Sequence, residues 1–478
     1  MPLFFTFDLY REEDETMNPK DILDVAVVSV NSEGEGIART GQDNFIVFIP
    51  GALPGERVRC RITRTSKKYA AARVLDVIEA SPARVEPKCP SFGHCGGCQL
   101  QHASYAHQLE MKARILSDAL TRIGRVEGCK TIECFPSPKE WGYRNKTILP
   151  VSPVFGTKKA IACGYYERRT HRISPFEGCA VLDPLLEKSV KGMIRLAAES
   201  GLTGYDEASG TGDLRHIAAR IASSREGQEV LTALVVSREL KPRDFGRLRH
   251  LQQLLAAENP AIVGSVLNIK TARDNFVWGP LFRGINGKSF LRHTLSGYRF
   301  DTDISTFFQV NALQAKRLFE RVRELQNEVD NLLELYCGVG GLTAYLSSRA
   351  QRIDAVEEWA PSVRLLKKNL EWNRIENVDV HRSSAEDFMK DTARAKRGAY
   401  DAVVLDPPRT GCDESVIEGI KRISPRSVIY VSCNPATLAR DVLRLSDEYS
   451  LESVEAFDMF PQTSHVEAIV LLSRLEGK

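Results

Sequence analysis

Residues 430–441 read YVSCNPATLARD, and the pattern predicts a buried strand that ends at a cysteine and is followed by a helix. The apolar run 428–431 suits a strand inside a sheet. Asn434 is a favourable N-cap, and Pro435 fits the first helical position because its missing N–H costs no hydrogen bond there. The apolar residues expected on the buried face of this helix are Leu438, Val442 and Leu445.

Cys433 lies at the tip of this strand, just outside the predicted helix N-terminus. The helix dipole and the free N–H groups favour an anion at that place, so we expect a lowered thiol pKa and a nucleophilic cysteine. The ordinary alternative is a small buried hydrophobic residue, because most intracellular cysteines serve as one.

The composition is that of a globular protein with several domains. At 478 residues the chain is long enough for about three domains of roughly 150 residues. Its apolar fraction of 43% and charged fraction of 27% are ordinary for such proteins. No apolar run reaches about eighteen residues, so we expect no membrane partner and a cytoplasmic location. Residues 1–18 are expected to form a flexible tail, and Met17 is an alternative start.

The net charge bears on whether the protein binds RNA, and the cysteine content bears on whether it binds metal. A net charge of +3 is too small to require nucleic acid, so RNA binding would have to rest on local basic patches. Disulfides are rare in the cytoplasm, so the eleven cysteines indicate metal binding, catalysis or packing.

Residues 21–78 contain short strand-like runs punctuated by glycine, which predicts a five-stranded barrel. Alternate residues of a strand share one face, so Arg57, Arg59 and Arg61 would form a phosphate-binding stripe near Tyr69. A solvated strand face is the alternative. The basic residues that accumulate in this half of the barrel are Arg57, Arg59, Arg61, Arg64, Lys67, Lys68 and Arg73.

Residues 89–98 read CPSFGHCGGC, a C-x5-C-x2-C spacing. Three thiolates this close, with Gly96 and Gly97 allowing the backbone to wrap tightly, form part of a cage for a metal or a cluster. The fourth ligand must come from elsewhere, and zinc would also accept four thiolates. The candidates for that ligand are Cys129, Cys134, Cys163 and Cys179.

The middle of the chain combines a helix with basic and aromatic clusters. Residues 108–123 have the periodicity of an amphipathic helix. The segments 141–146, 164–172 and 212–216 each place arginine beside aromatic or histidine side chains, as in surfaces that grip phosphates and stack unpaired bases. Amphipathic strand faces have the same composition, so each cluster alone is a weak indication.

Residues 331–343 read NLLELYCGVGGLT and predict a strand, a glycine loop and a helix start, where a backbone can approach a ligand closely. Glu357 follows at the tip of the next strand, in a position to accept hydrogen bonds from ribose hydroxyls. This pair fits NAD equally well. The later strand 402–405, however, ends in the sequence DPPRTG (406–411), and its resemblance to a methyltransferase motif argues against NAD. Asp406 would then lie at the edge where Cys433 stands.

Several segments resemble known modules. The first module resembles a TRAM domain, an OB-like barrel attached to RNA-modifying enzymes, and the D-P-P tip resembles the acceptor motif of S-adenosylmethionine-dependent methyltransferases. The TRAM-like module, the C-x5-C-G-G-C run and the later Gly178-Cys179 together resemble the iron–sulfur-containing RNA uracil-C5 methyltransferases. The segments that carry the TRAM resemblance are Gly34 with Gly36, and residues 45–49, 54–56 and 68–70.

The resemblance spans the chain beyond about residue 19 and implies an α/β fold. It implies a Rossmann-like class I methyltransferase domain over 306–478, an OB-like TRAM barrel over 19–80, and a central α+β domain over 81–305. The central domain would carry a [4Fe-4S] cluster, and its helical segment at about 103–135 would pack on the catalytic domain. By position, the ligands of that cluster would be Cys89, Cys95, Cys98 and Cys179.

The resemblance also assigns the chemistry. Carbon 5 of uracil is a poor nucleophile, so Cys433 would add to C6 to give an enolate whose C5 takes the methyl group from the sulfonium. A base must then remove the C5 proton, and Glu467 in the H-V-E segment 465–467 matches the family's base.

Residues that match the family's donor and acceptor contacts complete the expected site. Gly341 departs from relatives that carry asparagine there, and Ser384 would replace another polar contact to the donor. The base-binding residues would be Phe307, Gln309 and Asp406. The expected contacts to S-adenosyl-L-methionine are Gln309, Tyr336, Gly338, Gly341, Glu357, Ser384 and Asp406.

The function expected from this resemblance is methyl transfer to C5 of a specific uridine in 23S ribosomal RNA through a covalent cysteine–C6 adduct. The uridine would be flipped out of a loop or a remodelled segment, and the protein would be a monomer. The cysteine cluster favours the ribosomal branch, because the transfer RNA branch generally lacks both the cluster and the TRAM domain.

Four alternatives stay open. The acceptor could be a transfer RNA uridine. Amino-methyltransferases that act on adenine or glutamine share the D-P-P tip, but they usually have an aromatic residue where Arg409 stands. A cytosine-C5 enzyme would keep its cysteine and acid in other motifs. A non-catalytic RNA-binding or ribosome-assembly factor would not need Cys433, Glu467 and Gln309 together.

Overall fold

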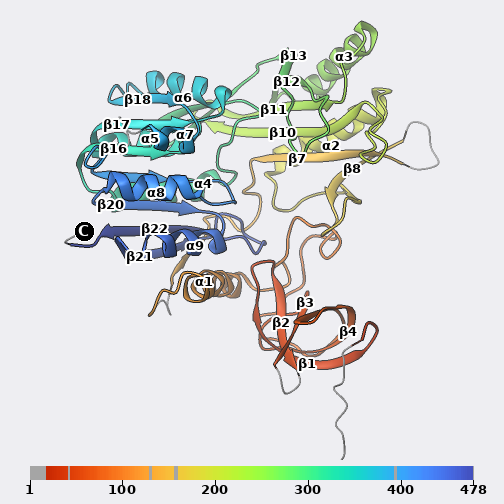
Figure 1. The fold of residues 1–478 in the computed structure, drawn as a ribbon. Coiled ribbons are helices and arrows are strands. Elements are labelled where there is room, and N and C mark those ends of the chain that lie inside the picture. The colour runs from red at the N-terminus through yellow and green to blue at the C-terminus, as the bar shows by residue number, and fades with distance from the viewer. Residues whose placement is uncertain (1–17, 41–43, 129–131, 155–159, 392–395, 477–478) are drawn as a thin grey trace, which may run out of the picture. The chain divides into compact units, whose positions relative to one another are not determined.

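The computed structural model describes residues 18–40, 44–128, 132–154, 160–391 and 396–476. The chain splits into two compact units, which meet in the sequence at Arg84 and Val85 (Figure 1). Residues 1–17 of the expected tail, Met17 among them, and Cys129 lie outside the described residues. None of the described helices is both long enough and apolar enough to cross a membrane.

The first unit is a closed five-stranded barrel, as the strand spacing predicts. Its neighbours around the barrel follow the order β1-β2-β3-β5-β4. The alternating residues Val25, Val47 and Ile49 point inward and are buried, whereas their neighbours face solvent. The strands are β1 (Ile22–Val30), β2 (Glu35–Thr40), β3 (Phe45–Pro50), β4 (Arg57–Thr65) and β5 (Tyr69–Glu79).

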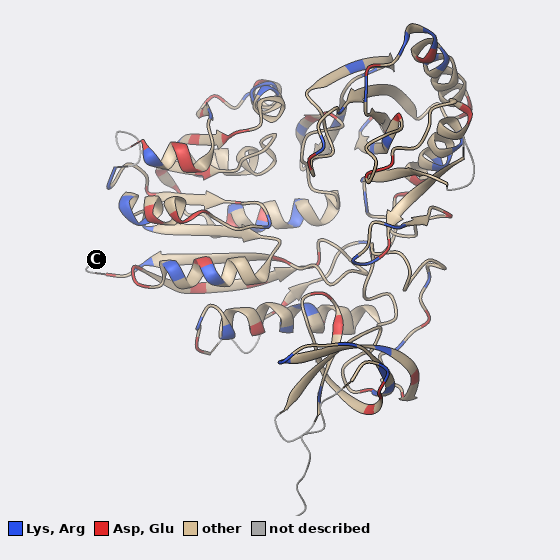
Figure 2. Cartoon of the chain, turned by 45° about the vertical axis from the view of Figure 1, so that its right-hand side comes forward, with Lys and Arg blue, Asp and Glu red and all other residues tan. Residues whose placement is uncertain are grey.

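The basic stripe on β4 is partly neutralised within the barrel. Arg59 donates two hydrogen bonds to the carboxylate of Asp24, at 2.8 and 2.9 Å, and Arg57 lies 3.8 Å from Glu79. A guanidinium held by a carboxylate is less available to a phosphate. Basic and acidic residues are likewise interspersed over the whole chain (Figure 2).

The second unit contains a seven-stranded sheet. The apolar side chains of α2 (Pro184–Glu199) and α3 (Pro242–Glu258) form one buried cluster with this sheet, while β14 (Leu291–Leu295) contacts β10 and β11. β14 pairs with β15 (Tyr298–Thr302) in a hairpin. The strands of the sheet in spatial order are β13 (Leu281–Gly287), β12 (Ile262–Ile269), β11 (Gly227–Val236), β10 (Leu214–Ser224), β7 (Lys146–Pro153), β8 (Ile161–Tyr166) and β9 (Ile173–Pro175).

The same unit contains an eight-stranded sheet. Its first five strands in space are parallel, and the β22 strand is antiparallel to both of its neighbours. The strands in spatial order are β18 (Val378–Arg382), β17 (Ala350–Glu357), β16 (Val329–Leu335), β19 (Ala402–Leu405), β20 (Ser427–Ser432), β22 (Glu467–Arg474), β21 (Tyr449–Phe457) and β6 (Cys134–Phe135). The strand order reverses beside β16, and open α/β sheets bind ligands at such a switch point.

Helices cover both faces of the eight-stranded sheet. On one face α4 (Ala312–Leu325), α5 (Gly341–Leu346) and α6 (Ala360–Trp372) share a buried apolar cluster with the strands. On the other face the described residues form four helices, each in contact with the next. These are α7 (Ala385–Lys390), α8 (Glu414–Ile423), α9 (Pro435–Leu445) and α1 (Tyr105–Arg122).

The boundaries predicted between the domains at 80/81 and 305/306 stay predictions. The hairpin of β14 and β15 lies before the second of these boundaries and still packs on α6, where the Asp301 N–H donates to Asn369 Oδ1 at 2.7 Å. Helix α1 precedes the seven-stranded sheet in the sequence but contacts α9 of the other sheet (Figure 1).

Candidate active site

The strand, cysteine and helix at residues 427–445 form as their sequence predicts. The β20 strand ends at Ser432, Asn434 accepts a hydrogen bond from the Ala436 N–H at 3.1 Å, and Pro435 opens α9. The helix face that carries Leu438, Val442 and Leu445 is buried. The Asn434 side chain also donates to the Arg409 carbonyl at 2.8 Å, so the cysteine turn is bonded to the segment after Asp406.

The register of the sheet brings Cys433 and Glu467 together. β20 and β22 are antiparallel, and Ser432 with Ala468 is their last pair. Cys433 directly follows that pair on one strand and Glu467 directly precedes it on the other, and the Glu467 carboxylate is close enough to raise the pKa of Cys433. The strand ends therefore place the candidate nucleophile and the candidate base next to each other.

The pKa of Cys433 is raised to about 11, because burial and the carboxylates of Glu467 and Asp406 disfavour the thiolate. The Arg409 guanidinium acts in the opposite direction. The lowered pKa expected from the helix N-terminus is therefore wrong, since desolvation and two nearby acids outweigh the helix dipole.

The two acids are themselves perturbed. Burial raises the pKa of Asp406 to about 7. Burial, and then Asp406, raises the pKa of Glu467 well above its usual range, and only 1% of Glu467 is exposed. Neighbouring buried carboxyls whose pKa values are displaced in this way are typical of acid–base sites.

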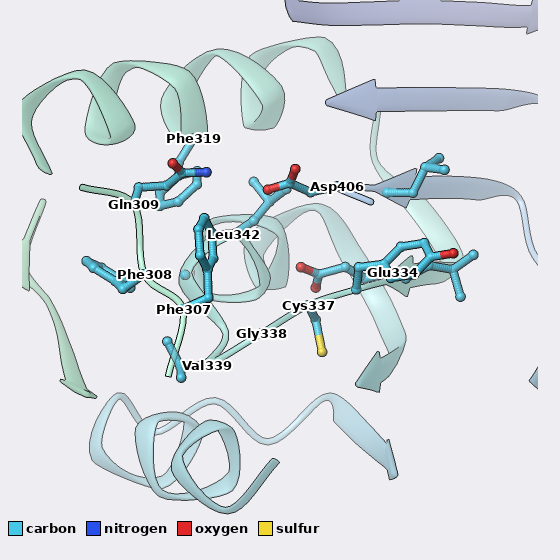
Figure 3. A pocket seen from close by; sticks show the side chains of 14 residues that line it. Phe307, Phe308, Gln309, Phe319, Glu334, Cys337, Gly338, Val339, Leu342 and Asp406 are labelled. Carbon is cyan, nitrogen blue, oxygen red and sulfur yellow. The ribbon is translucent and has the colours of Figure 1, made fainter. Parts of the chain in front are cut away.

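A cleft opens beside these groups at the switch point of the sheet (Figure 3). The carboxylates of Glu334 and Asp406 point into it, and Phe307 and Gln309 face them from the loop before α4 (Figure 3). Burial raises the pKa of Glu334 to about 8, and its Oε2 atom has no hydrogen-bond partner. The residues that line the cleft are Phe307, Phe308, Gln309, Phe319, Glu334–Val339, Gly341, Leu342, Leu405 and Asp406.

The glycine loop adopts the conformation that its sequence requires. Gly338 and Gly340 have φ angles of +59° and +85°, a region that favours glycine. Glu357 accepts hydrogen bonds from the Gly338 N–H at 3.0 Å and the Trp359 N–H at 2.7 Å, so it braces this loop. Tyr336 also lines the cleft, with its backbone at a φ of +62°.

Gly341 and Ser384 differ from the other expected donor contacts. A Cβ atom added at Gly341 would lie 3.2 Å from the Phe319 ring and 3.5 Å from Phe308, so two aromatic rings occupy the space of a side chain. Ser384 caps α7 by accepting the Asp387 N–H at 3.1 Å, and it does not line the cleft. A cap accounts for this serine without a ligand.

The cluster 141–146, which the sequence assigns to an RNA surface, instead holds the loop that carries Gln309. The Asn145 side chain donates to the Gln309 carbonyl at 3.1 Å, and Lys146 Nζ donates to the Thr306 carbonyl at 3.2 Å. Arg220 is 1% exposed and donates to the Asp303 carbonyl at 2.7 Å. A lone arginine inside the apolar run of β10 was the available signal for this role.

The cluster 212–216 is also engaged within the protein. Arg215 donates to the carbonyls of Lys270 and Ala272, at 3.1 and 2.8 Å, and stacks on Tyr205 with 4.3 Å between the guanidinium carbon and the ring centroid. In the cluster 164–172, His171 pairs with Glu207 at 2.8 Å. These contacts leave Arg215 unavailable to phosphates.

The four cysteines expected to share a cluster line one cavity of ≈ 270 Å³. Burial raises the pKa of Cys98 to about 12, and burial also raises the pKa of Cys95 and of Cys179. The described residues contain no group of three or more His, Cys, Asp or Glu side chains arranged to hold a single metal ion. Cys134 and Cys163, the other described candidates for the fourth ligand, do not line this cavity.

The cavity also borders the catalytic side of the unit. Its lining includes Arg409, whose guanidinium partly opposes the rise in the pKa of Cys433, and His465, two residues before Glu467. Burial and nearby cations lower the pKa of His465 to about 4, so this side chain is neutral at physiological pH.

The strand order β18-β17-β16-β19-β20-β22-β21, with a glycine loop after β16 and a D-P-P tip after β19, defines a class I methyltransferase fold. The family profile of tRNA (Uracil-5-)-methyltransferase matches residues 296–475, and the TRAM domain profile matches residues 20–75. An uncharacterized RNA methyltransferase of Halalkalibacterium halodurans is 34% identical over 464 residues, or 96% of this chain and 99% of that protein. The chain belongs to the RNA uracil-5-methyltransferase family.

A second relative and a solved structure are also similar to this chain. An uncharacterized RNA methyltransferase of Gloeobacter violaceus is 36% identical over 454 residues, which cover 94% of this chain and 96% of that protein. The crystal structure of the Pyrococcus abyssi tRNA (uracil-54, C5)-methyltransferase in complex with S-adenosyl-L-homocysteine matches with a TM-score of 0.72 at 24% identity, covering 94% of this chain and 100% of that chain. The predicted class I fold and TRAM barrel are therefore confirmed.

Proposed function

We propose that the protein transfers a methyl group from S-adenosylmethionine to C5 of a uridine in 23S ribosomal RNA. The observation that carries this proposal is the position of Cys433 and Glu467 on either side of the last pair of β20 and β22, next to a cleft lined by Asp406. Methyl transfer to an oxygen or an amine needs no thiol, whereas C5 of uracil needs both a nucleophile and a base.

The cleft has the groups that a methyl donor of this kind requires. Glu334 offers an unpartnered, buried carboxylate oxygen to an ammonium group, and Glu357 keeps acceptor capacity for ribose hydroxyls beside Gly338. Asp406 and Gln309 border the same space. When bound, S-adenosylmethionine supplies an electrophilic methyl group on a positively charged sulfur.

Cys433 and Glu467 act on the uracil ring in two different steps. The Cys433 thiolate adds to C6, which places negative charge on the ring and makes C5 nucleophilic. Once C5 carries the methyl group, Glu467 takes the C5 proton, and the electrons of that bond expel the thiolate. Because its pKa is raised, an ionised Glu467 is a stronger base than an ordinary carboxylate.

The ring of Phe307 suits an unstacked base. Its side chain is apolar, is 63% exposed and lines the cleft, so it can stack on a uracil that has left the RNA stack. We expect the protein to act as a monomer on such a flipped uridine.

The four cysteines that line one cavity support a [4Fe-4S] cluster. In such a cluster each cysteine binds a different iron, so the thiolates do not need to converge on one point as they do for a single ion. The ligands would be Cys89, Cys95, Cys98 and Cys179, and they would bind iron as thiolates after losing their protons. The cluster would have a structural role.

The choice of 23S ribosomal RNA rests on the cysteine cage combined with the TRAM barrel. Transfer RNA is the second candidate acceptor, because a solved structure with a similar fold is that of a tRNA (uracil-54, C5)-methyltransferase. The test is to incubate anaerobically purified protein with radiolabelled S-adenosylmethionine and unmodified transcripts of each RNA, and then to identify the labelled nucleoside. Labelled 5-methyluridine in 23S ribosomal RNA alone supports the proposal, and label confined to transfer RNA or to another nucleoside contradicts it.

A further inference from the structure

The segment that leads into the candidate base is buried without being part of a helix or strand. Residues 458–466 connect β21 to β22, and Asp458, Gln462 and Ser464 are each no more than 3% exposed. Gln462 has a φ of +73°, which is an uncommon conformation for a residue with a side chain. A buried irregular segment needs partners for its backbone groups, and those partners fix its shape.

Helix α1 supplies one set of partners. The Gln108 side chain donates to Gln462 Oε1 at 3.0 Å and accepts the Gln462 N–H at 2.9 Å, so it grips this residue by both its side chain and its backbone. Lys112 donates to Asp458 Oδ1 at 2.5 Å and to the Phe460 carbonyl at 2.9 Å. Both members of this ion pair are fully buried.

The residues at and just after the end of the cysteine loop (89–98) supply the other set of partners. The N–H groups of Gln99 and Leu100 both donate to the Gln462 carbonyl, at 3.1 and 3.0 Å. The Gln99 side chain accepts the Ser464 N–H at 3.3 Å and donates to the Gly96 carbonyl at 2.8 Å. One side chain thus bonds the turn between Cys95 and Cys98 to the segment that precedes Glu467.

We infer that Gln99 and Gln108 are positioning residues for Glu467. Through Gln99, a structural change in the cysteine loop 89–98 would alter the position of Glu467 and so the rate of proton removal. This inference rests on the proposed function. A general base must lie within hydrogen-bond reach of the proton it takes, and a displacement of about 1 Å can cost a hundredfold in rate. Gln99 and Gln108 bond the segment that leads into Glu467, and within the described part of the chain they make no hydrogen bond to the turn that carries Cys433. We therefore expect their loss to displace Glu467 more than Cys433.

A displacement of Glu467 with little change at Cys433 has a measurable consequence. If only Glu467 is displaced, the Cys433 adduct still forms but resolves slowly, so covalent protein–RNA complex accumulates. Loss of general stability would lower both steps together and would leave no excess of adduct. Accumulated adduct therefore distinguishes a positioning role from a merely structural one.

The first experiment compares Gln99→Ala and Gln108→Ala with the control Gln252→Ala, using unmodified 23S ribosomal RNA. Gln252 is also a buried, hydrogen-bonded glutamine, but it lies on α3 and bonds Ser265 and Met193. We expect about a ten- to hundredfold fall in kcat for the first two variants, an unchanged KM for S-adenosylmethionine, and a larger fraction of RNA that stays bound in denaturing gels. Equal adduct in the wild type and these variants, or an equal rise with Gln252→Ala, overturns the inference.

The second experiment needs no RNA. Hydrogen–deuterium exchange is followed in residues 458–466 of the full chain, before and after an iron chelator removes the absorbance of the reconstituted cluster, and in Gln99→Ala. We expect exchange to rise severalfold in this segment in both cases and to stay unchanged in β10. Unchanged exchange in 458–466 overturns the coupling, whereas raised exchange in a protein that methylates no RNA overturns the proposed function alone.

Discussion

Cys433 shows how a single residue can be placed by local sequence and tuned by distant groups. Its position at the strand tip follows from the apolar run and the Asn434-Pro435 cap that surround it. Its pKa of about 11 follows from burial and from carboxylates that stand 27 and 34 positions away in the sequence, a balance that the helix dipole does not overcome. At neutral pH Cys433 is therefore mainly a thiol, and the proposed mechanism requires the thiolate to be formed before the attack on C6.

Replacing Cys433 by alanine should remove methyl transfer while leaving RNA binding intact. The proposed nucleophile is lost in this variant, so we expect activity to fall by at least about a thousandfold. Methyl incorporation from labelled donor measures the loss, and a gel-shift assay with the same RNA is the control. Turnover equal to that of the wild type would contradict the nucleophile assignment.

Replacing Glu467 by glutamine should trap the adduct. The amide fills the same buried space but cannot take the C5 proton, so the Cys433–C6 bond persists after methyl transfer. Denaturing gels should show RNA-linked protein that disappears only slowly. A variant that forms no such species, although it binds both substrates, would remove Glu467 from the role of base.

Glu334 should make stability depend on pH. Its pKa is raised to about 8 in the folded protein, above the ordinary value of 4.5, because burial disfavours the ionised form. A group with a raised folded pKa contributes stability below its unfolded pKa and loses that contribution as pH rises through the folded pKa, here between about 4.5 and 8. We expect Glu334→Gln to reduce the fall in melting temperature between pH 5 and pH 9. A fall of wild-type size in the variant would contradict this assignment.

At the level of helices and strands, the sequence predicts those elements that depend on interactions between residues close together in the chain. The barrel strands, the glycine loop and the unit of β20 and α9 follow from caps, turns and apolar periodicity within a few residues. The contacts of the 458–466 segment do not, because Gln108 and Gln462 are 354 positions apart and neither stands in a motif. The fourth cysteine of the cage likewise depends on how β8, β9 and the loop before α2 fold together, and spacing alone leaves several candidates.

Removing only one partner of the buried ion pair between Lys112 on α1 and Asp458 should destabilise the protein. Lys112→Met leaves the Asp458 carboxylate buried without its partner, which typically destabilises a protein by about 3–5 kcal/mol. Combining it with Asp458→Asn removes the stranded charge, so the double variant should recover much of that loss. Thermal unfolding of both variants measures the difference. A double variant less stable than Lys112→Met would contradict the ion-pair explanation.

At the level of the whole molecule, acidic and basic residues are interspersed along the described part of the chain, so we expect RNA binding to depend on local basic patches (Figure 2). Arg59 is held by Asp24, whereas Lys67 and Lys68 are exposed at the β4–β5 turn. A basic residue contributes most to phosphate binding when no acid holds it.

Replacing both Lys67 and Lys68 by alanine should weaken binding of any RNA to a similar extent. We expect the slope of log affinity against log salt concentration to become shallower by about 1.4, or roughly 0.7 for each single-strand phosphate contact. The matched control is Arg59→Ala, for which we expect a smaller change. Equal slopes for the double variant and the wild type would exclude this turn from the RNA contact.

The place of α1 and β6 in the eight-stranded sheet has a consequence during protein synthesis. Both elements emerge from the ribosome long before β21, the strand that they border. At ordinary translation rates of about 5–20 residues per second, the interval is on the order of tens of seconds. Throughout that time the apolar face of α1, which includes Met111, Ile115 and Leu116, has no sheet to pack on. We therefore expect this face to stay accessible to chaperones until the last strands are made.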